Sequence, residues 1–272
     1  MAESPAAAQL MLDRVAMVAQ SVGLLVNVGK TNVMASLVGP SPSLHVNGAA
    51  LENVCSFRYL GSDIASTAGC EGEVGIRLGR AQAAYAMLQQ CLWSRRDISV
   101  STKLRVYAAV VRSTMLYACE TWPLRHADLH RLVVFEHRCL RRILRLRWWD
   151  FVSNEVLYRR CHLDPLESIV AGSRWRWLGH VLPMHENRLP RRSFLAEPLA
   201  DWNRHTGAQV VTLTRRIKTD AEKVLRFHMR VGWRRAWRQQ LVMLAADRSG
   251  WRDVVTQLRV ACGARLAGRV LA

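Results

Sequence analysis

The chain has 272 residues, half of them hydrophobic, so it can bury a substantial core as one large domain or two small ones. This composition excludes a disordered chain, and the formal charge of +18 points to an anionic partner such as nucleic acid or an acidic membrane surface. No aliphatic run approaches the roughly 20 residues that a bilayer-spanning helix needs, so we expect a soluble protein with no membrane partner.

The positive charge is unevenly distributed along the chain. Residues 1–90 carry five basic and six acidic side chains, whereas residues 91–272 carry the other 34 basic side chains and all ten tryptophans. Two regions of different character therefore meet near residue 90. Only four of the 39 basic residues are lysine. Arginine's planar fork suits bidentate phosphate contacts, but a GC-rich coding sequence would produce the same bias.

In the N-terminal region, the sequence predicts one helix followed by short strands. Apolar residues at helical spacing predict a helix over 9–22, with Leu12, Val15, Val18 or Ala19, and Val22 on one face. Strands are expected over 24–28 and 33–38, followed by a loop over 39–43.

A hairpin is expected next, because the Asn47-Gly48 pair tolerates the positive φ of a tight turn. A last strand contains Phe57 and Tyr59 and ends at Gly61.

After residue 70 the apolar period becomes helical. One stripe runs from Val74 to Leu92 at steps of four and three. Ser99 or Ser101 caps a second helix, and Asp128 precedes a third. Three amphipathic helices with short connections predict a small bundle.

Beyond residue 150 the chain is expected to stay helical and arginine-rich. Helices are expected after Ser153 and Pro165, and over 230–241, where Trp233 and Trp237 share one face. Tryptophans at this spacing are more often core than stacking platforms. Trp175, Arg176, Trp177 and His180 are candidates for base stacking or for a structural cluster, and we expect the structural role.

Together these patterns predict an α+β, mainly α fold in three parts. Residues 1–70 form a small β-hairpin region, residues 71–150 a three-helix bundle, and residues 151–272 a basic, Trp/Arg-rich helical region.

The third predicted helix carries a cluster of arginines. Arg138, Arg141, Arg142 and Arg145 follow the spacing i, i+3, i+4 and i+7, which predicts that they share one face. With no acid between them they repel one another unless an anion lies among them, so we expect contact with an RNA or DNA backbone. A solvated helix face is the alternative. Lys103, Arg105 and Arg112 form a candidate second row.

The sequence gives less support for disulfides, for a metal site or for a phosphate-binding loop. Seven cysteines at irregular spacing, without a CxxC pair, argue against a disulfide framework and a zinc ribbon, so we expect an intracellular protein, in the nucleus or the cytoplasm. His130 and His137 would lie about 10 Å apart along a helix, too far to share one metal ion. The GKT triplet at Gly29 to Thr31 lacks the first glycine of a phosphate-binding loop, because Leu24 occupies that position.

Five segments in order resemble the C-terminal part of LINE-type, non-LTR retrotransposon reverse transcriptases: VGLLVNVGKTNVM, SFRYLGSDI, ISVSTKLRVYAAVVRSTMLYACETW, FEHRCLRRILRLRWWDFVSNEVL and RWRWLGHVLPMHENRLPRR. The resemblance spans about residues 9–220. It implies the end of a polymerase palm over 1–70, a thumb over 71–150 and the region after the thumb. It also implies that Lys30 and Thr31 lie near the phosphates of an incoming nucleotide, and that Tyr59, Leu60 and Gly61 form the hairpin that steers the primer end.

The metal-binding half of such an active site is missing. Polymerases of this family hold two Mg²⁺ ions with carboxylates, chiefly an adjacent aspartate pair, and this chain has no two acidic residues side by side. We therefore expect a fragment without catalytic residues or cofactor of its own, since Mg²⁺ is expected only in the full-length family enzyme. Such a fragment binds at most RNA or DNA, and its protein partners are unknown. A non-functional relic or a co-opted helical protein-interaction scaffold is the alternative.

Overall fold

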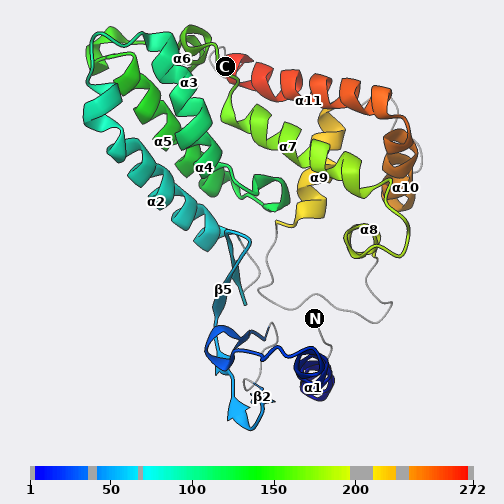
Figure 1. The fold of residues 1–272 in the computed structure, drawn as a ribbon. Coiled ribbons are helices and arrows are strands. Elements are labelled where there is room, and N and C mark those ends of the chain that lie inside the picture. The colour runs from blue at the N-terminus through cyan, green and yellow to red at the C-terminus, as the bar shows by residue number, and fades with distance from the viewer. Residues whose placement is uncertain (1–3, 36–41, 67–69, 197–210, 225–232, 269–272) are drawn as a thin grey trace. The chain divides into compact units, whose positions relative to one another are not determined.

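The computed structural model describes residues 4–35, 42–66, 70–196, 211–224 and 233–268 (Figure 1). The chain divides into two compact units, Met1–Glu73 and Val74–Ala272. The fold is mainly helical with small pairs of strands, which confirms the predicted α+β, mainly α class. The three-part division at residues 70 and 150 stays a prediction.

Helix α1 (Pro5–Ser21) starts four residues earlier than predicted. The Ser4 hydroxyl accepts a hydrogen bond from the Ala7 N–H group, and proline is favoured at the first helical position, so Ser4-Pro5 forms an efficient start. The predicted inward face is wrong for Val15 and Val22, which are 59% and 68% exposed. Helix α1 instead turns Ala8, Leu12 and Ala16 toward a small core.

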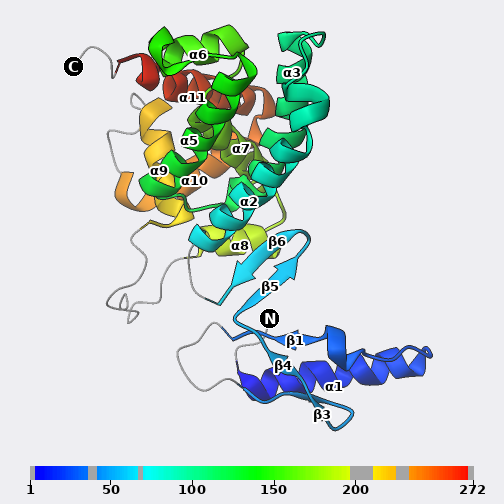
Figure 2. The same cartoon turned by 90° about the vertical axis from the view of Figure 1, so that its left-hand side faces the viewer.

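That orientation is fixed by one polar side chain. Gln9 Nε2 donates to the His45 carbonyl oxygen at 2.8 Å, and Gln9 Oε1 accepts from the His45 N–H group at 2.9 Å. These bonds hold α1 against β2, and Figure 2 shows the neighbouring strands beside the helix. The core between them contains Val33, Leu44, Val46 and Leu51.

The strands are short and pair two by two. They are β1 (Asn32–Val33), β2 (His45–Val46), β3 (Ala49–Ala50), β4 (Glu52–Asn53), β5 (Ser56–Tyr59) and β6 (Ser62–Ala65). Strands β2 and β3 are antiparallel around Asn47 and Gly48, with φ of 50° and 80°, which confirms the predicted hairpin. Strands β1 and β4 are parallel, and β5 and β6 are antiparallel.

Two predicted strands are corrected. Residues 24–28 form no strand: Val28–Lys30 is a 3-10 turn, in which the Asn27 side chain accepts from the Lys30 N–H group at 3.1 Å. The strand expected over 33–38 is reduced to β1, and residues 36–41 lie outside the described part of the chain, as does most of the expected loop. Strand β6 was not predicted, because its sequence alternates too little to show the period of a strand.

The first helices of the second unit follow the predicted order. They are α2 (Glu71–Met87), α3 (Val100–Val106), α4 (Ser113–Met115) and α5 (His126–Ile143), and Figure 1 shows α2, α3 and α5 side by side. Ser99 is the cap of α3, since its hydroxyl accepts from the Thr102 N–H group at 3.1 Å. The predicted helices are interrupted by π-helical segments at Gln89–Trp93 and Tyr107–Arg112.

Six further helices follow: α6 (Asn154–Cys161), α7 (Leu166–Val181), α8 (Leu189–Leu195), α9 (Leu213–Val224), α10 (Trp233–Ala246) and α11 (Arg248–Gly268). Ser153 caps α6 and Pro165 precedes α7, as predicted. Helices α7 and α11 lie side by side (Figure 1).

Tryptophan builds the core between α7 and α11. The Trp175 and Trp251 rings stack with centroids 5.1 Å apart, and Trp251 Nε1 donates to the Trp175 carbonyl oxygen at 3.0 Å. A Cβ atom at Gly179 would lie 2.2 Å from Trp251 Nε1, so only glycine permits this approach. Trp175 and Trp237 are buried core residues, whereas the Trp233 side chain lies outside the described part.

A buried ionic network joins the segment before α4 to α5 and α6. Glu136 on α5 is fully buried; its Oε1 accepts from Arg112 Nε at 2.7 Å, and its Oε2 accepts from the Tyr158 hydroxyl at 2.6 Å. Arg112 also donates to the Asp164 carbonyl oxygen at 2.6 Å. Both carboxylate oxygens are therefore satisfied, and α5 is held firmly by its neighbours.

Candidate nucleic-acid interface

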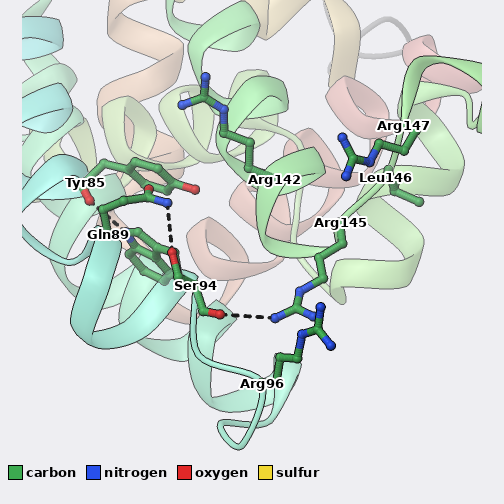
Figure 3. Close-up of a pocket in the computed structure, with 9 residues that line it drawn as sticks. Tyr85, Gln89, Ser94, Arg96, Arg142, Arg145, Leu146 and Arg147 are labelled. Atoms are coloured by element: carbon green, nitrogen blue, oxygen red, sulfur yellow. Dashed lines mark hydrogen bonds between the residues drawn. The ribbon is translucent and has the colours of Figure 1, made fainter.

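A pocket of about 710 Å³ opens at the C-terminal end of α5 (Figure 3). The residues lining it are Tyr85, Gln89, Trp93, Ser94, Arg96, Arg142, Arg145, Leu146 and Arg147. Four of these carry guanidinium groups, and none of the described lining residues is acidic. The acid closest in sequence, Asp97, is occupied by Arg95 at 2.7 Å.

The end of α5 places two of these arginines. The helix stops at Ile143, and Arg145 adopts a left-handed conformation with φ of 56°. The chain turns back there, with the Leu146 N–H group donating to the Arg141 carbonyl oxygen at 2.9 Å. Arg145 then donates to the Ser94 carbonyl oxygen at 3.3 Å, as Figure 3 shows, and to the Arg95 carbonyl oxygen, also at 3.3 Å.

The opposite wall of the pocket is aromatic. The Tyr85 and Trp93 rings stack with centroids 4.9 Å apart, and Trp93 Nε1 donates to the Tyr85 carbonyl oxygen at 2.7 Å. Burial raises the pKa of Tyr85 to about 12, so its hydroxyl stays neutral. Gln89 Nε2 donates to the Ser94 hydroxyl at 3.2 Å, which links this wall to the loop that receives Arg145.

The pocket continues as a groove between α2 and α5. A second hollow of about 580 Å³ shares Tyr85, Gln89 and Arg142 with the first. A third, of about 520 Å³, shares Gln82, Phe135 and Arg138 with the second. We call these three hollows together the α2–α5 groove.

The two walls of the α2–α5 groove differ in character. The α5 wall carries Arg131, Arg138 and Arg142, whose spacing keeps them on one helix face. The α2 wall is uncharged, with two glycines, one alanine and two glutamines at steps of four and three: Gly75, Gly79, Gln82, Ala86 and Gln89. Within the part of the chain that the structure describes, no Asp or Glu lines the groove.

The structure brings together three of the four arginines predicted as one face. Arg138, Arg142 and Arg145 line the groove. Arg141 points elsewhere and donates to the Val152 carbonyl oxygen at 2.9 Å and to Asn154 Oδ1 at 2.8 Å, which secures the start of α6. Arg145 reaches the groove through the turn after α5, not through the helical spacing that the sequence suggested.

The three basic residues expected as a second row of nucleic-acid contacts do not lie on one surface. Lys103 and Arg112 are buried, whereas Arg105 is exposed on α3. Lys103 Nζ donates to the carbonyl oxygens of Trp93, at 3.2 Å, and Arg95. Burial, and then the charge of Arg145, lower the pKa of Lys103. Lys103 thus supports the loop that forms one side of the pocket.

Three groove arginines were not singled out from the sequence. Arg96 lies in the connection before α3, Arg147 follows the end of α5, and Arg131 lies two turns before Arg138. Arg131 could have been found by extending the same helix face by seven residues. Arg96 and Arg147 lie in irregular segments, where spacing along the sequence carries no directional information.

The residues matched to the palm lie in the first unit. Lys30 is exposed at the end of a 3-10 turn, and the Thr31 hydroxyl donates to the Asn27 carbonyl oxygen at 2.8 Å. Tyr59 is exposed at the end of β5, while Leu60 and Gly61, with φ of 48° and 84°, make the turn into β6. The structure leaves their proposed roles open.

The histidines considered as metal ligands are placed by the structure. The described residues contain no group of three or more His, Cys, Asp or Glu side chains that could hold a metal ion. The His126 and His130 rings stack 6.5 Å apart, and burial lowers the pKa of His137 to about 4. The adjacent aspartate pair that the resemblance implies for two Mg²⁺ ions is not present in these 272 residues.

These features define a mainly helical α+β protein with a basic groove. No protein-family model and no solved structure matches the chain. A putative uncharacterized transposon-derived protein of Caenorhabditis elegans is 23% identical over 215 residues, covering 76% of this chain and 76% of that protein. This similarity supports a transposon origin. Across the described helices, none combines the length and the apolarity needed to cross a membrane.

Proposed function

We propose that the α2–α5 groove binds the phosphate backbone of RNA or DNA, in a chain descended from the C-terminal part of a retrotransposon reverse transcriptase. One observation carries this proposal: the pocket at the end of α5 gathers Arg96, Arg142, Arg145 and Arg147 without a described acidic lining residue. Guanidinium groups that line one pocket repel one another, and an anion bound among them reduces that repulsion.

The contrast with other arginines strengthens this argument. Arg112 is paired with Glu136, Arg125 with Asp128, and Arg174 with Asp220. Among the described residues, no guanidinium group of a groove arginine forms an ion pair with a carboxylate; Asp150 accepts only from the backbone N–H group of Arg147. These three arginines are neutralised by a carboxylate, whereas the guanidinium groups of the groove keep their charge available to a ligand.

The dimensions of the groove suit a nucleic-acid strand. Arg131 and Arg142 are 11 residues apart on α5, which corresponds to about 16 Å at 1.5 Å per residue. A strand of B-form DNA advances about 3.4 Å per nucleotide, so the groove can follow about five nucleotides. A backbone contact of this kind fixes position without reading sequence.

We propose no polymerase activity for these 272 residues alone, because they lack adjacent carboxylates. In the polymerase that the resemblance implies, Lys30 and Thr31 would contact nucleotide phosphates, and Tyr59, Leu60 and Gly61 would guide the primer end. A protein-interaction scaffold is the second candidate, favoured by exposed apolar side chains on α1 such as Met17 and Val18.

The salt dependence of binding tests the proposal. The full chain is titrated into a fluorescein-labelled 20-base-pair duplex between 50 and 200 mM salt, and compared with the double variant Arg142→Gln/Arg145→Gln. Each phosphate contact contributes about 0.9 to the slope of log K against log salt, so the variant's slope should be about 1.8 smaller. The control variant Arg159→Gln/Arg160→Gln removes two exposed charges from α6, outside the groove. Equal slopes for the two double variants would refute the assignment.

A further inference from the structure

Three large aromatic side chains stand out next to the basic pocket. Trp148 is 81% exposed, Trp149 53% and Phe151 85%, whereas Trp93, Trp175 and Trp251 are buried. We call these three exposed rings the aromatic turn. Exposing so much aromatic surface is unfavourable in water, and a cluster of such side chains marks an interaction site.

The aromatic turn is held in place from both ends. The Arg147 N–H group donates to Asp150 Oδ2 at 2.6 Å, which closes the 3-10 turn Trp148–Asp150. Phe151 follows with a left-handed φ of 47°, uncommon for a bulky residue. On the far side, Arg141 holds the Val152 carbonyl oxygen at 2.9 Å. The rings are therefore presented on a fixed backbone.

Arg147 links the aromatic turn to the basic pocket. It lines the pocket with Arg145, and its guanidinium carbon also lies 5.9 Å from the centre of the Trp149 ring. The rings of Trp148 and Trp149 meet edge to face with centroids 5.4 Å apart, and Trp148 stays 81% exposed. The guanidinium group of Arg147 therefore lies between the basic pocket and the aromatic rings.

We propose that the pocket and the aromatic turn together select single-stranded nucleic acid, a conclusion that rests on the proposed backbone binding. A ligand that fits both parts carries phosphates and exposed flat rings in succession. A single strand offers its bases for stacking, while a duplex keeps them inside its own stack. Base-on-aromatic stacking tolerates any sequence, because every base has a π-face.

The test separates bases from phosphates. The full chain and the variant Trp148→Ala are titrated with three ligands: a (dT)₁₂ strand, an abasic strand of the same length, and a 12-base-pair duplex. The native chain should bind (dT)₁₂ at least about fivefold more tightly than the abasic strand, the gain that one stacked base provides. Trp148→Ala should lose that gain and bind the abasic strand and the duplex as the native chain does.

Two further variants control for size and shape. Trp148→Phe keeps a ring and should restore most of the preference for (dT)₁₂. Met243→Ala removes another exposed apolar side chain, on α10 and outside the pocket lining, and should change nothing. Because Trp148 and Met243 are exposed, neither substitution disturbs the core.

The failures of the two proposals are distinguishable. Equal affinity for (dT)₁₂ and the abasic strand, or equal losses for strand and duplex in Trp148→Ala, would overturn the single-strand inference while leaving backbone binding intact. Such a result would assign the aromatic turn to a protein partner. Failure of all three ligands to bind at 50 mM salt would overturn backbone binding and this inference with it.

Discussion

Gly79 offers a way to change the groove without harming the fold. It lies within α2, lines the α2–α5 groove, and a Cβ atom added there would have no neighbour within 4 Å. Glutamate is a better helix former than glycine, so Gly79→Glu should raise the free energy of unfolding by about 0.5 kcal/mol. The same substitution places a carboxylate opposite the arginines of α5.

The effect of that carboxylate on binding can be worked out. A phosphate about 8 Å from the new charge, with an effective dielectric constant of about 40, is repelled by about 1 kcal/mol. That energy corresponds to about fivefold weaker binding. Stability and affinity should therefore move in opposite directions, which a variant that merely damages the fold cannot produce.

The matched control is Gly263→Glu. Gly263 lies within α11, a Cβ atom there also meets nothing within 4 Å, and the residue does not line the groove. Urea denaturation should show a similar gain in stability for both variants, and fluorescence titration with the 20-base-pair duplex should show weaker binding for Gly79→Glu alone. Equal affinities for the two variants would refute the assignment of the groove.

Two further predictions concern the supports of α5. Glu136→Ala leaves the buried Arg112 without its counter-charge and should lower the free energy of unfolding by about 3–5 kcal/mol, whereas Glu155→Ala, which breaks an exposed pair with Arg159, should cost at most about 1 kcal/mol. Comparable losses in urea denaturation would contradict this. Burial lowers the pKa of His137 to about 4 from a usual value of 6.5. The unfolded state then binds the proton more readily than the folded state. The free energy of unfolding is therefore at its full value, with respect to His137, above pH 6.5, and it decreases as the pH falls toward 4. Allowing for its partial exposure, the loss should be on the order of 2 kcal/mol, and His137→Phe should remove it; an unchanged acid dependence would contradict the assignment.

The sequence predicted the parts of the fold that depend on regular periods. The stripe from Val74 onward identified α2, Ser153 was correctly placed as a cap, and of the two serines offered for α3 Ser99 is the cap, because these signals are local. The inward face of α1 was wrong, because hydrogen bonds from Gln9 to a residue 36 positions away decide its orientation. No local pattern contains that information.

The same distinction applies to the candidate site. Four arginines at helical spacing were predicted to act together, yet Arg141 secures α6 while Arg145 joins the groove only because α5 has already ended. Lys103 and Arg112 looked equivalent to Arg105 in sequence but are buried with protein partners. A basic residue's role depends on which acids and carbonyl oxygens surround it, and that is a property of the tertiary structure.

The pocket arises where helical periodicity breaks down. The π-helical segment Gln89–Trp93 ends α2 so that Trp93 folds back onto Tyr85, and the chain then passes Ser94 and Arg96 along the pocket. Across from it, the left-handed Arg145 turns the end of α5 toward the same loop. π-Helical segments are frequent at functional sites, whereas a left-handed residue is a common way to end a helix. Both helix ends thus place arginines at one pocket: Arg96 after the π-helical segment, and Arg145 and Arg147 after α5.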